Sequence, residues 1–171
     1  LMVLRRGGGP PEDHLVRDLP ELLRRGDTLV LNDTAVHPAR LIGRKRGGGG
    51  RVEGLFLQAL EPGRWRVLLR GGRLRDGVVV DLDPPDVGEA GGAGQAGADD
   101  GGLAITLLHR DAEAWIVGVD GEPDAAAALD RVGRTPLPPY ILAARRAAGL
   151  EVPDAADRAD YQPVHAAPER A

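Results

Sequence analysis

The sequence predicts an α/β (mixed) domain that is interrupted by a small antiparallel β-barrel domain. Short apolar runs recur between turn residues from residue 39 to residue 119, a spacing typical of an antiparallel barrel or sandwich. Helical patterns lie only on either side of this region. We therefore expect residues 1–42 and 123–171 to form two parts of one α/β unit, with residues 43–122 inserted between them as the barrel.

The first part of the chain predicts a short helix and a buried strand. Residues 16–25 favour a helix because Asp18 can cap its start, Pro20 suits its first turn and Gly26 can stop it. Residues 28–32 form a continuous run of threonine, leucine and valine that ends on asparagine. Such a run is typical of a strand buried on both faces.

The middle part predicts a series of antiparallel strands. Residues 39–46 and 51–60 are interpreted as two strands, joined by a permissive hairpin turn of glycines at 47–50. Shorter strands are expected at residues 64–70, 78–82, 103–110 and 114–119. The glycine- and alanine-rich residues 88–102 cannot pack a core, and we expect a loop without regular structure there. Neither glycine-rich stretch has the Lys-Ser/Thr ending of a phosphate-binding loop.

The last part predicts helices around a proline-rich segment. Residues 124–132 are rich in alanine, with Asp124 as a cap and Gly133 as a stop. A further one or two helical turns are expected within residues 140–149, directly after the prolines.

Composition limits the kind of protein that this chain can be. A length of 171 residues, 42% of them hydrophobic, and no long apolar run predict a soluble globular protein without a membrane span. The absence of cysteine excludes disulfides, thiolate zinc sites and cysteine nucleophiles. Base stacking on aromatic platforms is not expected, because the aromatic residues are only Phe56, Trp65, Trp115, Tyr140 and Tyr161.

Charge is distributed unevenly along the chain. Residues 1–80 hold 15 Lys and Arg against 9 Asp and Glu, whereas residues 81–171 hold 7 against 17. Within residues 40–75, ten basic residues face only two acidic ones. This excess favours a surface that binds a phosphate backbone, with Arg44, Lys45 and Arg46 as candidate RNA contacts. The alternative is that these arginines only occupy the solvent-exposed faces of the strands.

A polar cluster follows the strand expected at residues 28–32. Asn32, Asp33 and Thr34 offer an amide, a carboxylate and a hydroxyl at a strand end, where α/β proteins place ligand-binding groups. The cluster could hold ribose hydroxyls or accept a proton, or it could simply be an Asx turn. Arg40 could bind a carboxylate or phosphate through two hydrogen bonds, or lie on the surface.

The segment 135–141, Thr-Pro-Leu-Pro-Pro-Tyr-Ile, is conformationally restricted. Pro136, Pro138 and Pro139 fix φ and hold Tyr140 in a defined position. This would suit a rigid ligand wall, with the Tyr140 ring and hydroxyl against a nucleoside, or equally a plain linker between domains. We place the candidate site where residues 32–34 meet residues 136–140, because both segments flank the inserted barrel.

The histidines do not predict a metal site. No two of them lie at metal-ligand spacing, so no metal is assigned. His37 could act as a general base near the polar cluster, or be structural.

Several motifs occur in an order that few families share. They are RDLP at 17–20, NDTAVHPARL at 32–41, GRK at 43–45, PLPPYI at 136–141 and YQPVHA at 161–166. Together they resemble the S-adenosylmethionine:tRNA ribosyltransferase-isomerase family of queuosine biosynthesis. The chain departs from the family pattern at Ala35 (arginine in the family), His37 (isoleucine) and His165 (tyrosine). The family pattern also continues past residue 166 into a long C-terminal half, so we expect this chain to be a fragment or truncated product.

The resemblance implies a two-substrate reaction in the cytoplasm. The ribosyl part of S-adenosylmethionine would be transferred and isomerised onto 7-aminomethyl-7-deazaguanine in tRNA, giving epoxyqueuosine, adenine and methionine. It implies Asp33 as a catalytic residue, no cofactor besides S-adenosylmethionine as substrate, tRNA as partner, and a monomer that does not enter a membrane. The alternative is a non-catalytic RNA-binding barrel or an inactive fragment.

Overall fold

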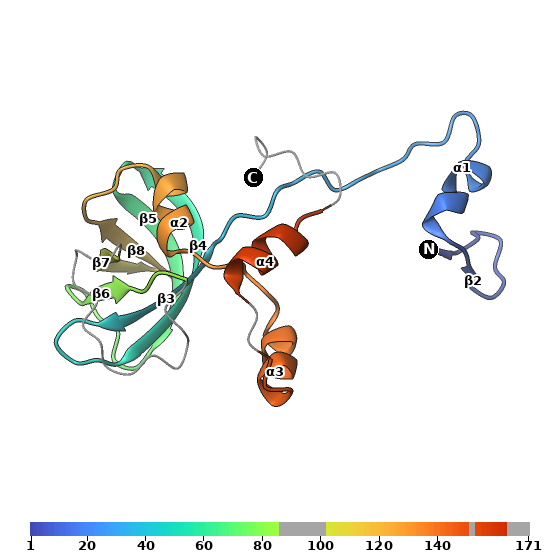
Figure 1. Ribbon diagram of the computed structural model, residues 1–171. Coiled ribbons are helices and arrows are strands. Elements are labelled where there is room, and N and C mark those ends of the chain that lie inside the picture. The colour runs from blue at the N-terminus through green and yellow to red at the C-terminus, as the bar shows by residue number, and fades with distance from the viewer. Residues whose placement is uncertain (86–101, 151–152, 164–171) are drawn as a thin grey trace. The chain divides into compact units, whose positions relative to one another are not determined.

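The computed structural model describes residues 1–85, 102–150 and 153–163 (Figure 1). The chain divides into two compact units, Leu1–Asn32 and Asp33–Ala171, and each is described by itself. The glycine-rich loop expected at 88–102 lies outside the described residues except for Gly102. The domain boundaries expected at residues 42 and 122 stay a prediction.

The unit Leu1–Asn32 contains a two-stranded sheet and short helices. Its elements are β1 (Met2–Val3), β2 (Glu12–Asp13), the 3₁₀ turn η1 (Val16–Asp18) and α1 (Leu19–Leu22). The strands β1 and β2 pair antiparallel. Asp18 is the N-cap residue of α1 and Pro20 lies in its first turn, as the sequence predicts. The helix ends at Leu22, earlier than the expected stop at Gly26.

The strand expected at residues 28–32 is not formed, and this prediction is wrong. The structure has no strand in this stretch, and Leu29, Val30 and Leu31 are 49%, 87% and 52% exposed. A strand buried on both faces needs hydrogen-bonded neighbours and covering layers. An apolar run alone supplies neither of these.

The unit Asp33–Ala171 contains a closed six-stranded antiparallel barrel in the order β3-β4-β5-β8-β7-β6. Its strands are β3 (Arg40–Lys45), β4 (Arg51–Glu61), β5 (Arg64–Gly71), β6 (Val79–Leu82), β7 (Leu103–Asp111) and β8 (Ala114–Val119). The barrel is closed where β3 pairs with β6, for example Gly43 opposite Leu82. Register shifts interrupt β4 and β7, as expected where a sheet bends to close. The barrel expected from the strand spacing is confirmed.

Alternation along the strands fills the barrel interior. In β5, Trp65 and Val67 point inward and are fully buried, while Arg66 between them is half-buried and Arg64 and Leu68 on either side are exposed. The Trp65 ring meets Phe56 edge to face, with ring centroids 5.2 Å apart. The core thus consists of aliphatic side chains together with the indoles of Trp65 and Trp115.

Three helices follow the barrel: α2 (Ala125–Val132), α3 (Pro139–Ala147) and α4 (Asp154–Asp160). Helix α2 starts and ends as predicted, since the Asp124 carboxylate accepts the Ala126 N–H at 3.0 Å and Gly133 is the C-cap residue. Its residues Leu129 and Val132 join the barrel core. Helix α3 begins one residue before its expected range, and α4 was not expected at all. Outside the barrel, the described residues form one two-stranded sheet and these helices, so an interrupted α/β domain is not confirmed.

Candidate functional site

The two connections to the barrel run side by side. The Arg40 N–H donates to the Arg134 carbonyl at 2.9 Å, and the Arg134 N–H donates back to the Arg40 carbonyl at 2.8 Å. At Gly133 the approach is so close that a Cβ would lie 1.8 Å from the Pro38 carbonyl oxygen. Only glycine fits there. The segment that follows the polar cluster therefore contacts the segment that precedes the prolines.

The first half of the proline segment is fixed by its neighbours. Arg134, Thr135 and Leu137 are buried. The Arg134 guanidinium donates to the Pro84 carbonyl at 2.9 Å, and the Thr135 N–H donates to the Asp154 carboxylate at 2.8 Å. These contacts hold the backbone rigidly, as the sequence predicts for this segment.

The second half of the segment opens helix α3. Pro138 is the N-cap residue and Pro139 the first helical residue, the position that proline favours. Pro138 is half-buried, whereas Pro139 is exposed and Tyr140 is 72% exposed. The Tyr140 ring is therefore accessible to a ligand.

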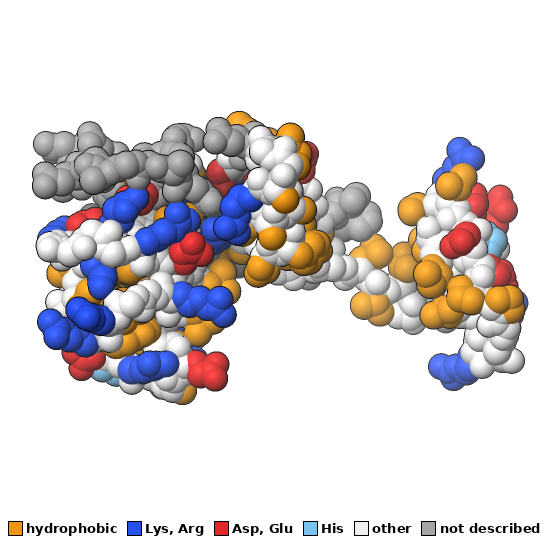
Figure 2. Space-filling model, turned by 90° about the horizontal axis from the view of Figure 1, so that it is seen from below, with side chains coloured by type: hydrophobic (Ala, Val, Ile, Leu, Met, Phe, Trp, Pro, Cys, Tyr) orange, Lys and Arg blue, Asp and Glu red, His pale blue; other side chains and the backbone are white. Residues whose placement is uncertain are grey.

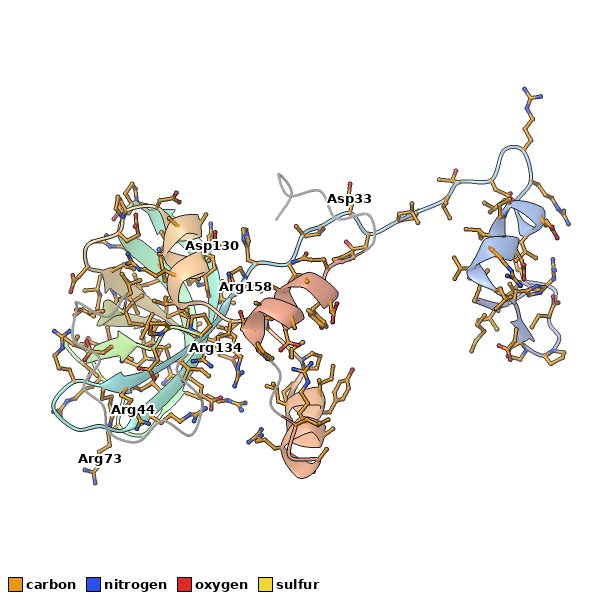
Figure 3. All side chains as sticks on the ribbon, in the orientation of Figure 1. Asp33, Arg44, Arg73, Asp130, Arg134 and Arg158 are labelled. Carbon is orange, nitrogen blue, oxygen red and sulfur yellow. The ribbon has the colours of Figure 1, made fainter. Side chains whose placement is uncertain are left out.

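The polar cluster lies before the paired connection. Asp33 is half-buried and Thr34 exposed on the connection that leads into β3 (Figure 3). Asn32 is exposed and belongs to the preceding unit. The structure brings Arg40 next to Arg134. A common ligand for Asp33 and Tyr140 stays a prediction.

Gln162, from the last matching motif, binds the same connection. Its side-chain oxygen accepts the Val36 N–H at 2.8 Å, and its side-chain nitrogen donates to the Val36 carbonyl at 2.9 Å. The Gln162 side-chain amide thus makes the same pair of hydrogen bonds to Val36 that the backbone of a neighbouring strand would make. By its residue type Gln162 could equally have contacted a ligand. In the structure its side chain holds the backbone that follows the polar cluster.

A network of ion pairs joins α4 to the end of α2. Arg158 contacts the Asp154 carboxylate at 2.6 Å, the Gly133 carbonyl at 2.6 Å and the Asp130 carboxylate at 3.5 Å. Figure 3 shows Asp130, Arg134 and Arg158 near one another where the connection reaches the barrel. Arg158 therefore fixes the backbone at Gly133 from helix α4.

A second ion pair joins α3 to α4. Arg145 binds Asp157 through two hydrogen bonds of 2.7 and 2.6 Å, and Asp157 is only 8% exposed. Hydrogen bonding to this carboxylate raises the pKa of Arg145 above its ordinary value. The sequence analysis missed α4, although Pro153 before Asp154 and the Asp154–Arg158 spacing of four residues are recognisable helix signals.

The three predicted RNA contacts lie at the end of β3 and in the turn after it. The Lys45 ammonium donates to the Gly72 carbonyl at 2.7 Å. Arg46 forms an ion pair with Asp81, and hydrogen bonding to this carboxylate raises the pKa of Arg46. Arg44 is half-buried on the strand. Lys45 and Arg46 therefore have structural contacts in addition to any with RNA.

Among residues 1–85, 102–150 and 153–163, no three His, Cys, Asp or Glu side chains are grouped so that they could bind a metal ion. Within the described ranges, none of the helices has the length and apolar character needed to cross a membrane.

Comparison with known proteins gives a consistent result. Residues 1–171 match the family described as queuosine biosynthesis protein. The S-adenosylmethionine:tRNA ribosyltransferase-isomerase of Anaeromyxobacter sp. (strain K) is 42% identical over 170 residues, which cover 97% of this chain and 42% of the relative. The protein of the same name from Rhodopseudomonas palustris (strain ATCC BAA-98 / CGA009) is 39% identical over 181 residues, covering 99% of this chain and 44% of the relative. The chain thus spans about two fifths of the length of these curated relatives. No solved structure matches the chain.

Proposed function

Since the chain belongs to the family of queuosine biosynthesis proteins, we propose that it serves the transfer and isomerisation of the ribosyl moiety of S-adenosylmethionine onto 7-aminomethyl-7-deazaguanine in tRNA. The products would be epoxyqueuosine, adenine and methionine. One observation carries the proposal: the family match extends over all 171 residues, and relatives with this activity in their names are about 40% identical. These relatives contain further sequence beyond the matched part, and it would contribute to the same site.

The proposed chemistry gives Asp33 the part of proton acceptor. The sulfonium of S-adenosylmethionine makes the ribose 5′ carbon acidic, so a base must remove its proton. The amine of the modified base then attacks, and both adenine and methionine leave, the latter by cleavage of the bond between the 5′ carbon and sulfur. Asp33 is half-buried on the connection that Gln162 clamps at Val36, which suits a group that must be held in one position.

The other site residues would bind the nucleoside. Asn32 and Thr34 offer hydrogen bonds to ribose hydroxyls, and Arg40 a charged pair to a carboxylate or phosphate. Pro138, Pro139 and Tyr140 would form a wall against the substrate. The exposed Tyr140 ring at the start of α3 supports this assignment.

We also propose how the domains are arranged and where in the cell the protein acts. Residues 1–42 and 123–171 would form one α/β unit in which the barrel is inserted. The protein would act as a monomer in the cytoplasm, where tRNA is modified, with S-adenosylmethionine consumed as a substrate and no other cofactor. The excess of basic residues in 40–75, most of which belong to β3, β4 and β5, supports the barrel as the tRNA-binding part.

The experiment that tests the proposal measures adenine release from S-adenosylmethionine in the presence of tRNA bearing the 7-aminomethyl base. The assay uses the product of the complete gene alongside the 171-residue chain. Asp33→Ala should decrease turnover by at least about 10²-fold, as expected for the loss of a proton acceptor. Near-normal release by this variant would leave Asp33 as a turn residue only, and no release by any form would contradict the proposed activity.

A second candidate function is a non-catalytic RNA-binding barrel. It is favoured by the closed barrel with its own hydrophobic core. Salt-sensitive tRNA binding without adenine release by the complete gene product would decide for this candidate.

A further inference from the structure

One end of the barrel collects basic residues from several turns. The turn 46–50 joins β3 to β4, and residues 72–78 join β5 to β6. Both lie at the same end, because Val52 pairs with Gly71 and Lys45 with Val80. The hairpin between β7 and β8 also closes at this end, since Asp111 pairs with Ala114. Figure 2 views the molecule from below and shows Lys and Arg side chains spread over the barrel.

Most cations at this end already have partners inside the chain. Arg46 binds Asp81, Arg66 binds Asp111 at 3.1 Å, and the Lys45 ammonium binds a backbone carbonyl. These side chains neutralise neighbouring acids or hold turns together. These side chains would therefore have to break a contact inside the chain before they could bind a ligand.

Three arginines at the end of β5 and in the connection to β6 differ from this pattern. Arg70, Arg73 and Arg75 are exposed. In the part of the chain that the structure describes, no hydrogen bond or ion pair is recorded for their side chains. Between residues 70 and 79 the only acidic residue is Asp76, so residues 70–79 carry a net charge of +2 (three Arg minus one Asp).

The connection is held in place from both sides. Leu74 packs against the barrel core, so the side chains of Arg73 and Arg75 on either side of it are left on the outside. Lys45 holds Gly72 by its carbonyl, and the Gly77 N–H donates to the Leu107 carbonyl at 2.7 Å. Figure 3 shows the Arg73 side chain pointing away from the barrel.

Arg73 also has an uncommon backbone conformation. Its φ is +55°, in the left-handed region that glycine adopts easily and a branched or long side chain does not. An arginine at this position keeps a cation at the tip of the turn at a conformational cost, although glycines stand directly before it. Such outliers concentrate at functional positions.

We infer that Arg70, Arg73 and Arg75 form the main phosphate-binding cluster of the barrel and contact the backbone of the tRNA. Guanidinium groups bind phosphate oxygens through paired charged hydrogen bonds, and cations that have no intramolecular partner break no ion pair when they do so. The inference rests on the proposed function, since it assumes that tRNA is the partner. It places the principal contacts in residues 70–75 and not in residues 44–46.

The test measures tRNA affinity of the 171-residue chain across a series of salt concentrations. Each phosphate contact contributes roughly 0.7 to 0.9 to the log–log salt slope, so the variant R70A/R73A/R75A should lower the slope by about 2 to 3 and weaken binding at least about tenfold at low salt. The variant R44A/K45A/R46A should lower the slope less. Circular dichroism and the melting temperature show whether each variant remains folded.

A matched control removes the same charge elsewhere. Arg17, Arg24 and Arg25 are three exposed arginines of the other unit, and their replacement by alanine should change the slope by less than about 1. An equal loss in this control would mean that net charge alone is sensed, and would overturn the inference. Unchanged binding by R70A/R73A/R75A beside salt-sensitive wild-type binding would overturn it too, while leaving tRNA as partner. No salt-sensitive binding by the wild type would overturn the inference and the proposed tRNA partner together.

Discussion

Strand β3 and the segment 28–32 lie close together in the sequence, and the more hydrophobic of the two is the one that does not form a strand. β3 has the sequence Arg-Leu-Ile-Gly-Arg-Lys, yet Leu41 and Ile42 are 0% and 3% exposed. Thr-Leu-Val-Leu-Asn at 28–32 has three consecutive large apolar residues, and these are 49% to 87% exposed. β3 has hydrogen-bonded neighbours on both edges, β4 and β6. Pairing, more than hydrophobicity, decides which segment becomes a strand.

The difference extends to the units that contain these segments. The barrel and α2 share one core of fully buried side chains. In Leu1–Asn32 none of the residues is buried, and all residues of this unit are described. The free energy of unfolding should therefore depend strongly on side chains of the barrel and weakly on those of the first unit.

The largest effect that tests this contrast is expected for Trp65→Ala. Trp65 is fully buried, so its loss leaves a large cavity and should destabilise the barrel by about 3 to 5 kcal/mol. Val30→Ala, at an 87% exposed position, should change stability by less than about 0.5 kcal/mol. Urea unfolding followed by circular dichroism measures both. Equal effects of the two substitutions would show that residues 28–32 are packed in solution.

The second effect concerns the junction where the two barrel connections meet. A Cβ at Gly133 would lie 1.8 Å from the Pro38 oxygen and 2.5 Å from the Leu129 oxygen, both of them backbone atoms that cannot easily move. Gly133→Ala should therefore destabilise by about 1 to 3 kcal/mol or more. Gly48→Ala is the matched control, because nothing lies within 4 Å of its added Cβ and its φ is not in the left-handed region. A neutral Gly133→Ala in the same urea assay would mean that the junction is looser than described.

The sequence predicted the barrel well because its signals are local. Each of the six strands was expected within one residue of its observed ends, since alternation and turn glycines mark them along the chain. The Asp124 cap of α2 is equally local. Helix α4 could have been recognised by the same kind of signal at Pro153 and Asp154.

The site could be predicted only in part, because its contacts join residues far apart in sequence. By its residue type Arg46 was a candidate RNA contact. In the structure it forms an ion pair with Asp81, which lies 35 positions away in the sequence. Gln162 reaches Val36 across 126 positions and so acts on backbone that no local pattern connects to it. The hydrogen bonds of both side chains are structural contacts within the chain.

The smallest effect is expected from pH, and it should be confined to the first unit. In this unit Glu12 on β2 accepts hydrogen bonds from Arg5 at 3.0 Å and contacts His14 at 3.3 Å. Hydrogen bonding to Arg5, followed by that to His14, lowers the pKa of Glu12 below its ordinary value of 4.5. A lowered pKa in the folded state means that the contribution to stability is present above pH 4.5 and is lost as the pH falls through the lower, folded-state pKa.

The β1–β2 pairing should therefore weaken as the pH falls below 4.5 and through the lowered folded-state pKa of Glu12. Amide hydrogen exchange or NMR shifts of Met2–Val3 and Glu12–Asp13 would follow the change between pH 6 and pH 3. Glu12→Gln, which cannot ionise, should remove this pH dependence. The barrel interior serves as the internal reference, because its core cluster consists only of apolar and aromatic side chains and has no group that titrates in this range. A loss of barrel protection at the same pH as the hairpin would mean that the two units unfold together, and the contrast between them would fail.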